Sequence, residues 1–569
     1  AAKIIDKYGS DCIKIIERDP YCLIYTIDGF GFKKADSIAK AAGLSDNSPE
    51  RVGAAVVYTL KQLSESDGHC YGTCEDVQLK TLDLLVESPG FLTSRQISGL
   101  LKKADVWEKI KDDYCARNKL SDDEKNEISK WFIKRNCMVE KIADAIIACA
   151  DDGRLVIEGA DIYCAKLYKA ENEAGQMIAE LCQEGPVKST TDQDILRAVH
   201  KVESAEGYIL EQEQINAAAA SLRARLFVIT GGPGRGKSTI IRTIIEAWGN
   251  DDTVELCAPT GRAAQRMKEV TGRYAETVSR KLQRPPRKEC LIICDEASML
   301  DIELARDLLK WGSMCNIIFI GDADQLPSVG PGSFFEDVVK SKNVPTIKLV
   351  KGHRNFGSIE ENAEKINTGQ SMKSFTIDNN FKFIPCNDSK IQDVIINEYL
   401  RMRDEYGEKN AVILSPMKDR TGSAINALNE KIRDILNPFI AGSPQLSGCK
   451  FRERDRVMQT KNIADKEVRY TDGRCGTGIY NGDCGIIERI SEDDNELTIA
   501  FDDGRVAVYE KHETEELILA YAMTIHKSQG SEYKGVIIAL TKGHNIMLRR
   551  RLFYTAETRA KGKAESIGE

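Results

Sequence analysis

The chain has 569 residues, 42% of them hydrophobic, and this length predicts about three to five domains with buried cores. Its 80 basic and 88 acidic residues give a net charge of −8 and a pI near 5.6. This excludes a surface that is basic all over, so any nucleic-acid contact is expected in a local groove. The 17 cysteines lack disulfide-framework spacing and indicate a reducing cytosol, and no apolar run reaches the roughly 18 residues of a membrane span.

The first 200 or so residues place apolar side chains at helical spacing, as in AAKIIDKYGSDCIKII and PERVGAAVVYTLKQL, and we predict an all-α region there. The pattern is already under way at Ala1, so we expect a fragment of a longer chain. Between the two stretches, Gly29 and Gly31 flank Phe30 ahead of a helix predicted to begin at Lys33. Backbone N–H groups at such a turn can hold a phosphate. Two interpretations stay open on these residues: a helix-hairpin-helix DNA-binding element, or an ordinary corner between helices.

From about residue 205 the pattern changes to short, β-favouring apolar runs that alternate with helical stretches. The runs are LFVIT, VELCAP, LIICDE, NIIFIGD, TIKLV, AVILSP and GVIIAL, and they predict parallel α/β units. From Cys449 to about His512 the runs DRVMQT, CGIIERI, ELTIAF and RVAVYE are joined by turns such as Asn481-Gly482-Asp483. That segment predicts a small β-barrel set inside the α/β region.

A phosphate-binding loop follows the first of these runs. Residues 231–238 read GGPGRGKS and fit G-x4-G-K-[ST] between a predicted strand and a predicted helix. Lys237 would neutralise the β and γ phosphates, and the Ser238 hydroxyl suits Mg2+. We therefore predict ATP and Mg2+ as cofactors. The expected nucleotide contacts of the loop are Gly232, Pro233, Gly234, Arg235, Gly236, Lys237, Ser238 and Thr239.

Carboxylates follow a second apolar run. In LIICDEAS, Asp295 is placed to bind Mg2+ and Glu296 to orient or deprotonate the attacking water. The alternative is two surface acids at a strand end, which their position downstream of a phosphate loop disfavours. After FIGD, Gln325 is a neutral side chain that could sense the γ-phosphate. Arg354 and Arg559 are candidate arginine fingers, although spacing alone does not separate them from surface arginines.

An ordered series of motifs accompanies these residues. LEQEQINAA resembles a Q motif with Gln214 at the adenine-reading position, LCAPTGRAAQRM resembles motif Ia, and ICDEASMLD resembles motif II. GDADQLPSVGPG, HRN, AYAMTIHKSQGSEY and LFYTAETRAK resemble motifs III to VI. Over most of residues 205–562 the chain thus resembles a RecD-like superfamily 1 helicase. DPYCLIYTIDGFGFKKADSIAKAAG and SDGHCYG resemble the N-terminal extension of the free-standing members, which favours the helix-hairpin-helix interpretation.

The resemblance implies a fold class and a domain order. The fold is α/β, with two RecA-like P-loop lobes built on parallel sheets, an all-α N-terminal region and an SH3-like β-barrel insertion. The implied domains are 1–75 (helix-hairpin-helix), 76–204 (helical, winged-helix-like), 205–348 (first lobe), 349–448 with 513–569 (second lobe) and 449–512 (SH3-like barrel).

The resemblance also implies a monomeric 5′→3′ motor on single-stranded DNA in the bacterial cytosol or nucleoid. It would act on 5′-tailed duplex DNA in repair or recombination, with a single-strand binding protein or repair factors as partners. The implied catalytic residues are Lys237, Asp295, Glu296, Gln325, Arg354 and Arg559. The implied DNA contacts are Gly29, Gly31, Pro259, Thr260, Arg262, Thr524, His526, Lys527 and Gln529; His526 in isolation reads as a buried structural histidine.

The sequence departs from the family pattern in three places. Between Leu282 and Leu291 it has only QRPPRKEC, where RecD-like enzymes usually carry a longer segment that forms the strand-separating pin. This shortening keeps an alternative function open, a DNA-stimulated ATPase that remodels protein–DNA complexes with little strand separation. Arg235 replaces a small hydroxyl residue, and we expect it to point to solvent. Residues 86–136 are longer and more charged than the family pattern, and no role is predicted for them.

Overall fold

The computed structural model describes residues 12–26, 30–102, 107–350, 357–418, 424–471, 473–541 and 548–568. The chain divides into two compact units. The first comprises residues 1–174, 301–303 and 329–332, and the second comprises the remainder. Within the described ranges, no helix has the length and apolar character that a membrane span requires.

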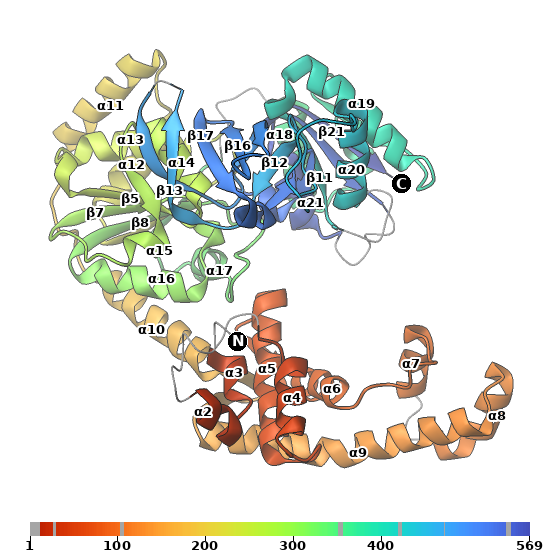
Figure 1. The fold of residues 1–569 in the computed structure, drawn as a ribbon. Helices are drawn as coiled ribbons and strands as arrows, with labels where there is room; N and C mark the ends of the chain where they lie inside the picture. Colours follow the sequence, from red (N-terminus) through yellow and green to blue (C-terminus); the bar gives the residue numbers. More distant parts are fainter. Residues whose placement is uncertain are drawn as a thin grey trace. The chain divides into compact units, whose positions relative to one another are not determined.

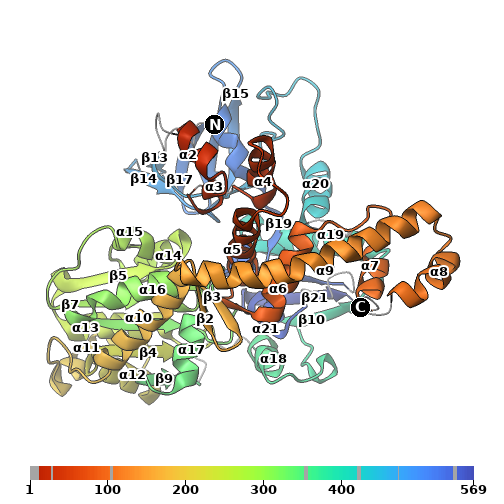
Figure 2. The same cartoon turned by 90° about the horizontal axis from the view of Figure 1, so that it is seen from below.

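The first unit is built mainly of helices. Its long helix α9 (Asp122–Asp151) packs against α5 (Pro49–Asp67) and α6 (Cys74–Leu85), as Figure 2 shows. Their buried residues join one hydrophobic core that includes Ile142 and Val56. The other helices are α2 (Cys12–Arg18), α3 (Cys22–Thr26), α4 (Phe32–Ala41), α7 (Ser94–Leu101), α8 (Trp107–Asn118) and α10 (Ala165–Leu181), which ends in the second unit.

The expected helical character of this region is confirmed with one correction. A small antiparallel sheet lies within it, in the order β1-β3-β2, formed by β1 (Tyr71–Thr73), β3 (Asp161–Cys164) and β2 (Leu155–Glu158). The strands are only three or four residues long, too short for a period-2 pattern to stand out from helical spacing. The region is therefore not all-α.

The first RecA-like lobe is a parallel sheet in the order β6-β5-β7-β8-β4-β9. Apolar residues of α11, α12 and α13 share a core with one face of the sheet, and α16 and α17 lie on the other side (Figure 1). The strands are β4 (Leu226–Thr230), β5 (Val254–Ala258), β6 (Ala275–Thr277), β7 (Cys290–Cys294), β8 (Cys315–Gly321) and β9 (Thr346–Lys348). The helices are α11 (Asp192–Glu206), α12 (Gln212–Leu222), α13 (Lys237–Trp248), α14 (Gly261–Thr271), α15 (Val278–Lys281), α16 (Ile302–Leu309) and α17 (Phe334–Ser341).

The second RecA-like lobe is also a parallel sheet, in the order β10-β21-β20-β11-β19. Helices α19 and α20 pack on one face, whereas α18 and α21 pack on the other. The strands are β10 (Phe381–Pro385), β11 (Ala411–Ser415), β19 (Ala522–Thr524), β20 (Tyr533–Leu540) and β21 (Ala560–Gly568). The helices are α18 (Ser358–Asn367), α19 (Ile391–Tyr406), α20 (Ile425–Leu436) and α21 (Arg550–Glu557).

The SH3-like insertion is an antiparallel sheet in the order β14-β13-β17-β16-β15-β12-β18. Its alternating inward residues, such as Leu497 and Ile499, join the core under α19 and α20 of the second lobe. The predicted turns around Gly482 and Gly504 have φ angles of 97° and 83°, a region that favours glycine. The strands are β12 (Arg456–Gln459), β13 (Ile463–Tyr470), β14 (Cys475–Ile479), β15 (Cys484–Ser491), β16 (Glu496–Phe501), β17 (Arg505–Glu510) and β18 (Leu517–Leu519).

The short segment at the expected pin position connects α15 directly to β7. Residues 282–289, all of them described, form turns and irregular backbone. The segment is held to the first lobe by Arg284, whose Nη2 lies 2.5 Å from Glu276, and by the Arg287 amide, which donates to Glu255. It therefore lies along the lobe as a compact connection.

Candidate nucleotide-binding site between the lobes

The glycine-rich loop joins β4 to the N-terminus of α13. Gly234 and Gly236 have φ angles of 78° and 76°, which a side chain would strain. Gly236 is the N-cap of α13, so the free N–H groups of the first helical turn face the loop and form an anion site. Lys237 Nζ lies over the loop and donates to Gly231 O at 2.8 Å. The loop thus has the backbone path and charge that a phosphate tail requires.

A cavity of about 920 Å3 opens beside this loop. Its volume lies within the range of small-molecule and cofactor sites, about 300–1,000 Å3. The residues of the loop and of the first turn of α13 that line it are Pro233, Gly234, Gly236, Lys237, Ser238 and Thr239.

Two carboxylates enter the cavity at the end of β7. Asp295 and Glu296 follow the buried strand, and the Glu296 amide donates to Asp295 Oδ1 at 2.9 Å. Burial and then the nearby Glu296 charge raise the pKa of Asp295 to about 6. A bound cation would offset both effects. The Ser238 hydroxyl and the Asp295 carboxylate supply the oxygen ligands that Mg2+ prefers, so these residues fit a nucleotide–Mg2+ complex.

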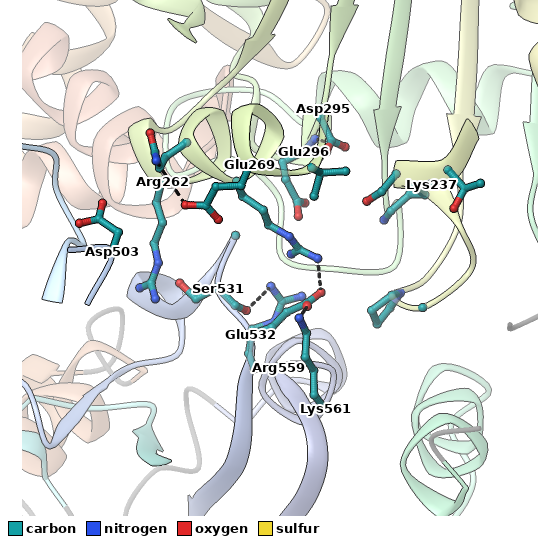
Figure 3. A pocket seen from close by; sticks show the side chains of 18 of the residues that line it. Lys237, Arg262, Glu269, Asp295, Glu296, Asp503, Ser531, Glu532, Arg559 and Lys561 are labelled. Atoms are coloured by element: carbon teal, nitrogen blue, oxygen red, sulfur yellow. Dashed lines mark hydrogen bonds and ion pairs between the residues drawn. The ribbon is translucent and has the colours of Figure 1, made fainter. Parts of the chain in front are cut away.

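The opposite wall of the cavity comes from the second lobe (Figure 3). Arg559 is only 2% exposed, and its guanidinium donates to Thr555 O and Ser531 O, each at 3.2 Å. Because these acceptors are neutral carbonyls, its charge remains available to a ligand. Glu532 and Lys561 lie next to it and face Lys237 and Asp295 across the cavity.

Gln325 connects this site to the contact between the lobes. Its side chain lines the cavity, and Nε2 donates to the buried Asp322 at 3.0 Å. Tyr554 of α21 donates to the same carboxylate oxygen at 3.0 Å. The adjacent Leu326 amide donates to Thr555 Oγ1, also at 3.0 Å. The position of Gln325 therefore depends on how the second lobe sits against the first.

The predicted DNA contacts fall into separate groups. Thr260 caps α14 by accepting the Ala263 amide, and Arg262 Nη1 lies 3.3 Å from both Gly482 O and Tyr533 Oη. Thr524, His526 and Lys527 are half-buried in the second lobe, as Pro259 is in the first. Gln529 is buried and donates to Leu326 O. Gly31 precedes α4 in the first unit, whereas Gly29 and Arg354 lie outside the described residues.

Three predicted nucleotide contacts are not brought to the cavity wall. Of the described residues that line it, none is Gln214, Gly232 or Arg235. Gln214 is buried in the capping box of α12, where its Oε1 accepts the Glu211 amide. The expectation that Arg235 points to solvent is wrong. Its side chain is 16% exposed and donates to backbone carbonyls, because the loop turns it toward the end of β9.

Several lining residues escaped sequence reasoning. Tyr208 and Ile209 are 41% and 83% exposed and line the cavity together with Arg242. Tyr208 Oη lies 2.9 Å from Thr239 Oγ1. The sequence signal that could have indicated Tyr208 and Ile209 is their position as an apolar pair directly before the Q-motif-like segment. Arg266, Glu532 and Lys561 also line the cavity, but nothing in their sequence spacing brings them together.

The comparisons with known proteins agree with this arrangement. Four family models match in order: ATP-dependent RecD2 DNA helicase HHH domain over 1–71, AAA domain over 209–389, ATP-dependent RecD-like DNA helicase SH3 domain over 428–501, and UvrD-like helicase C-terminal domain over 519–564.

Individual proteins are also similar to this chain. The ATP-dependent RecD2 DNA helicase of Deinococcus radiodurans is 29% identical over an alignment that covers all of this chain and 72% of the relative. The RecBCD enzyme subunit RecD of Mycolicibacterium smegmatis is 26% identical over 63% of this chain and 71% of its own. Among solved structures, a Bacteroides Pif1 bound to ssDNA is 21% identical over 63% of this chain and 92% of its own, with a TM-score of 0.37. With its phosphate loop and acidic pair facing an arginine across the cavity between two RecA-like lobes, and with four family models matched in order along it, this chain is similar to the RecD-like superfamily 1 DNA helicases.

Proposed function

We propose that the chain is an ATP-dependent helicase that moves 5′→3′ along single-stranded DNA and unwinds duplexes in repair or recombination. The observation that carries this proposal is the cavity that both lobes enclose. Lys237, Asp295 and Glu296 lie on its first-lobe side, and Arg559 lies on its second-lobe side. A site completed only when two lobes meet couples chemistry to movement of the lobes.

The residues of the site divide the chemical work. ATP supplies the phosphoryl group that is transferred to water. Lys237 and the N–H groups of the first turn of α13 hold the phosphates, and Ser238 and Asp295 would hold Mg2+. Glu296 orients the attacking water. Arg559 stabilises negative charge that develops in the transition state. We keep Arg354 as a second candidate for this last role.

Movement of the lobes is proposed to act on DNA through two sets of half-buried polar side chains. Thr260 and Arg262 come from the first lobe, and Thr524 and Lys527 come from the second. Hydroxyl and cationic groups suit phosphate contacts that do not read bases. Burial and then the charge of Lys418 lower the pKa of Lys527, and a phosphate nearby would oppose that shift. Single-stranded and 5′-tailed DNA are the proposed substrates, and the Deinococcus relative is a DNA helicase.

A paired assay tests this function. Hydrolysis of ATP is measured with single-stranded DNA, duplex DNA, RNA and no polymer, beside displacement of a strand from duplexes that carry a 5′ tail or a 3′ tail. We expect DNA-stimulated hydrolysis and displacement only from the 5′-tailed substrate. Lys237→Ala is expected to lower hydrolysis on the order of 100-fold or more while DNA binding persists. The matched control is Lys268→Ala, at an exposed lysine on α14. Displacement from the 3′-tailed substrate alone would contradict the polarity, and full hydrolysis by Lys237→Ala would contradict the site.

A second candidate function is a translocase that remodels protein–DNA complexes with little strand separation. It is favoured by the compact course of residues 282–289, which run along the first lobe from α15 to β7. DNA-stimulated hydrolysis without displacement from either tailed duplex would select this candidate.

A further inference from the structure

Arg235 connects the phosphate loop to the chain that leaves the first lobe. Its Nη1 donates to Leu349 O at 2.8 Å and to Val350 O at 2.6 Å. These two residues directly follow β9, the edge strand beside β4. Hydrogen bonds from a guanidinium are stronger than those between neutral groups. The Arg235 side chain is 16% exposed and Leu349 is buried, so solvent competes little for the bond to Leu349 O, whereas Val350 is exposed.

The exit segment Leu349–Val350 is also packed directly against the loop. The Leu349 amide donates to Thr230 O at 2.8 Å, and a Cβ placed on Gly231 would lie 2.9 Å from Leu349 Cβ. Glu213 of α12 accepts the Val350 amide with both carboxylate oxygens at 3.1 Å. The segment cannot shift along the loop without breaking these contacts, so a movement of the loop is passed to it.

The second lobe reaches Arg235 from the other side. Arg235 Nε lies 3.9 Å from Glu360 Oε1 on α18. A Cβ on Gly232 would lie 3.4 Å from Arg235 Nε and 3.1 Å from Tyr554 Oη on α21. One arginine of the phosphate loop therefore contacts both the exit from the first lobe and a helix of the second.

From these contacts we infer that Arg235 is a positioning residue that couples the state of the phosphate loop to the arrangement of the lobes. The inference rests on the proposed ATP-driven function. Because Arg235 does not line the nucleotide cavity within the described residues, it acts through the exit segment and not on the phosphates. Lys237 donates to the carbonyl of Gly231, the glycine that packs on Leu349. When a phosphate draws the Lys237 ammonium toward itself, this hydrogen bond to Gly231 breaks. The part of the loop that Arg235 ties to the exit segment is then released.

The experiment compares Arg235→Thr and Arg235→Lys with a matched control, Arg225→Thr. Arg225 lies in the same lobe, is 13% exposed, and donates to the carbonyls of Gly185 and Gly312 away from the exit segment. For Arg235→Thr we expect the KM for ATP to stay within about twofold and the stimulation of kcat by single-stranded DNA to fall about tenfold, within the usual range of coupling between sites. Arg235→Lys should retain part of the stimulation because an ammonium can reach one of the two carbonyls. Arg225→Thr should lower thermal stability without changing stimulation.

A second measurement needs no hydrolysis. In the wild type, a non-hydrolysable ATP analogue should change hydrogen exchange at the Leu349 and Val350 amides, and Arg235→Thr should abolish that change. A rise in KM with equal loss of basal and stimulated hydrolysis would place Arg235 on the nucleotide and overturn the inference. The inference would also be overturned if Arg235→Thr kept the wild-type stimulation of kcat by single-stranded DNA, or if it kept the wild-type change in hydrogen exchange at Leu349 and Val350. If the wild type does not hydrolyse ATP, the proposed function fails, while the exchange comparison still decides whether Arg235 links the loop to the exit segment.

Discussion

Arg266 of the first lobe and Glu532 of the second form an ion pair at the edge of the cavity, with Nη2 2.6 Å from Oε1. Lys561 Nζ lies 2.5 Å from the other carboxylate oxygen. Burial alone would raise the pKa of Glu532, but the two cations outweigh it and lower the pKa to about 2. One carboxylate of the second lobe is therefore shared between a cation of each lobe.

Glu532→Gln is expected to lower the free energy of unfolding by about 1–3 kcal/mol at pH 7, because two cations lose their acceptor. A depressed carboxylate pKa stabilises the fold above the unfolded value of about 4.3, and this contribution is lost as pH falls toward 2. The difference in free energy of unfolding between the variant and the wild type should therefore become smaller below about pH 4. Urea unfolding at pH 7 and pH 3.5 measures it, with the exposed Glu515→Gln as control. A difference that widens in acid would contradict the assignment.

Asp295→Asn should abolish ATP hydrolysis yet stabilise the nucleotide-free protein. A raised folded pKa gives full stability below the unfolded value of about 3.9, and stability is lost as pH rises through about 6. Above pH 6 the variant avoids this loss of folding free energy, about 3 kcal/mol. Thermal melts from pH 4.5 to 8, without nucleotide or divalent cations, should show that the melting temperature of the variant exceeds that of the wild type by more as the pH rises. A difference in melting temperature that stays constant with pH would mean that Asp295 is not the titrating group.

Glu557→Leu should also stabilise the protein, and more at pH 8 than at pH 5. Glu557 on α21 is fully buried, and neither carboxylate oxygen has a hydrogen-bond partner among the residues that the structure describes. Burial raises its pKa well above the ordinary value, so its folded-state advantage is lost as pH rises above about 4.3. Melting temperatures at both pH values test this, with the exposed Glu515→Leu as reference. Equal shifts at the two pH values would count against a protonated Glu557.

Gly261→Ala should destabilise the contact between motif Ia and the barrel by about 1–3 kcal/mol, the usual cost of overpacking. A Cβ at Gly261 would lie 2.4 Å from Tyr480 Cγ and 2.6 Å from Tyr480 Cβ, atoms too close to the backbone to escape by rotation of the ring. In a Tyr480→Gly background, which removes both of these atoms, the same substitution should cost little. A double-mutant cycle by urea unfolding measures this interaction, and additive effects would show that the two residues do not touch.

Local pattern was enough for the elements that carry the phosphate chemistry. The predicted run LFVIT forms β4, and the apolar run before Asp295 forms β7. Both could be predicted because a parallel strand that is buried on both faces has an unbroken run of apolar residues. The glycines before Lys237 similarly require only the loop backbone, where Gly234 and Gly236 adopt positive φ. Strands β10 and β21 were missed, because polar residues such as Lys382 and Glu565 interrupt their apolar pattern.

Only the tertiary structure decided which side chains share the cavity and which turn away from it. Gln214 satisfies a helix cap, and Arg235 reaches the carbonyls after β9, two local choices that a motif does not encode. The packing of the two lobes brings together Arg266, Glu532 and Lys561. Arg266 is separated from Glu532 by more than 260 residues in the sequence. Short-range periodicity determines the elements and their phosphate loop, whereas long-range packing determines the charge that faces that loop.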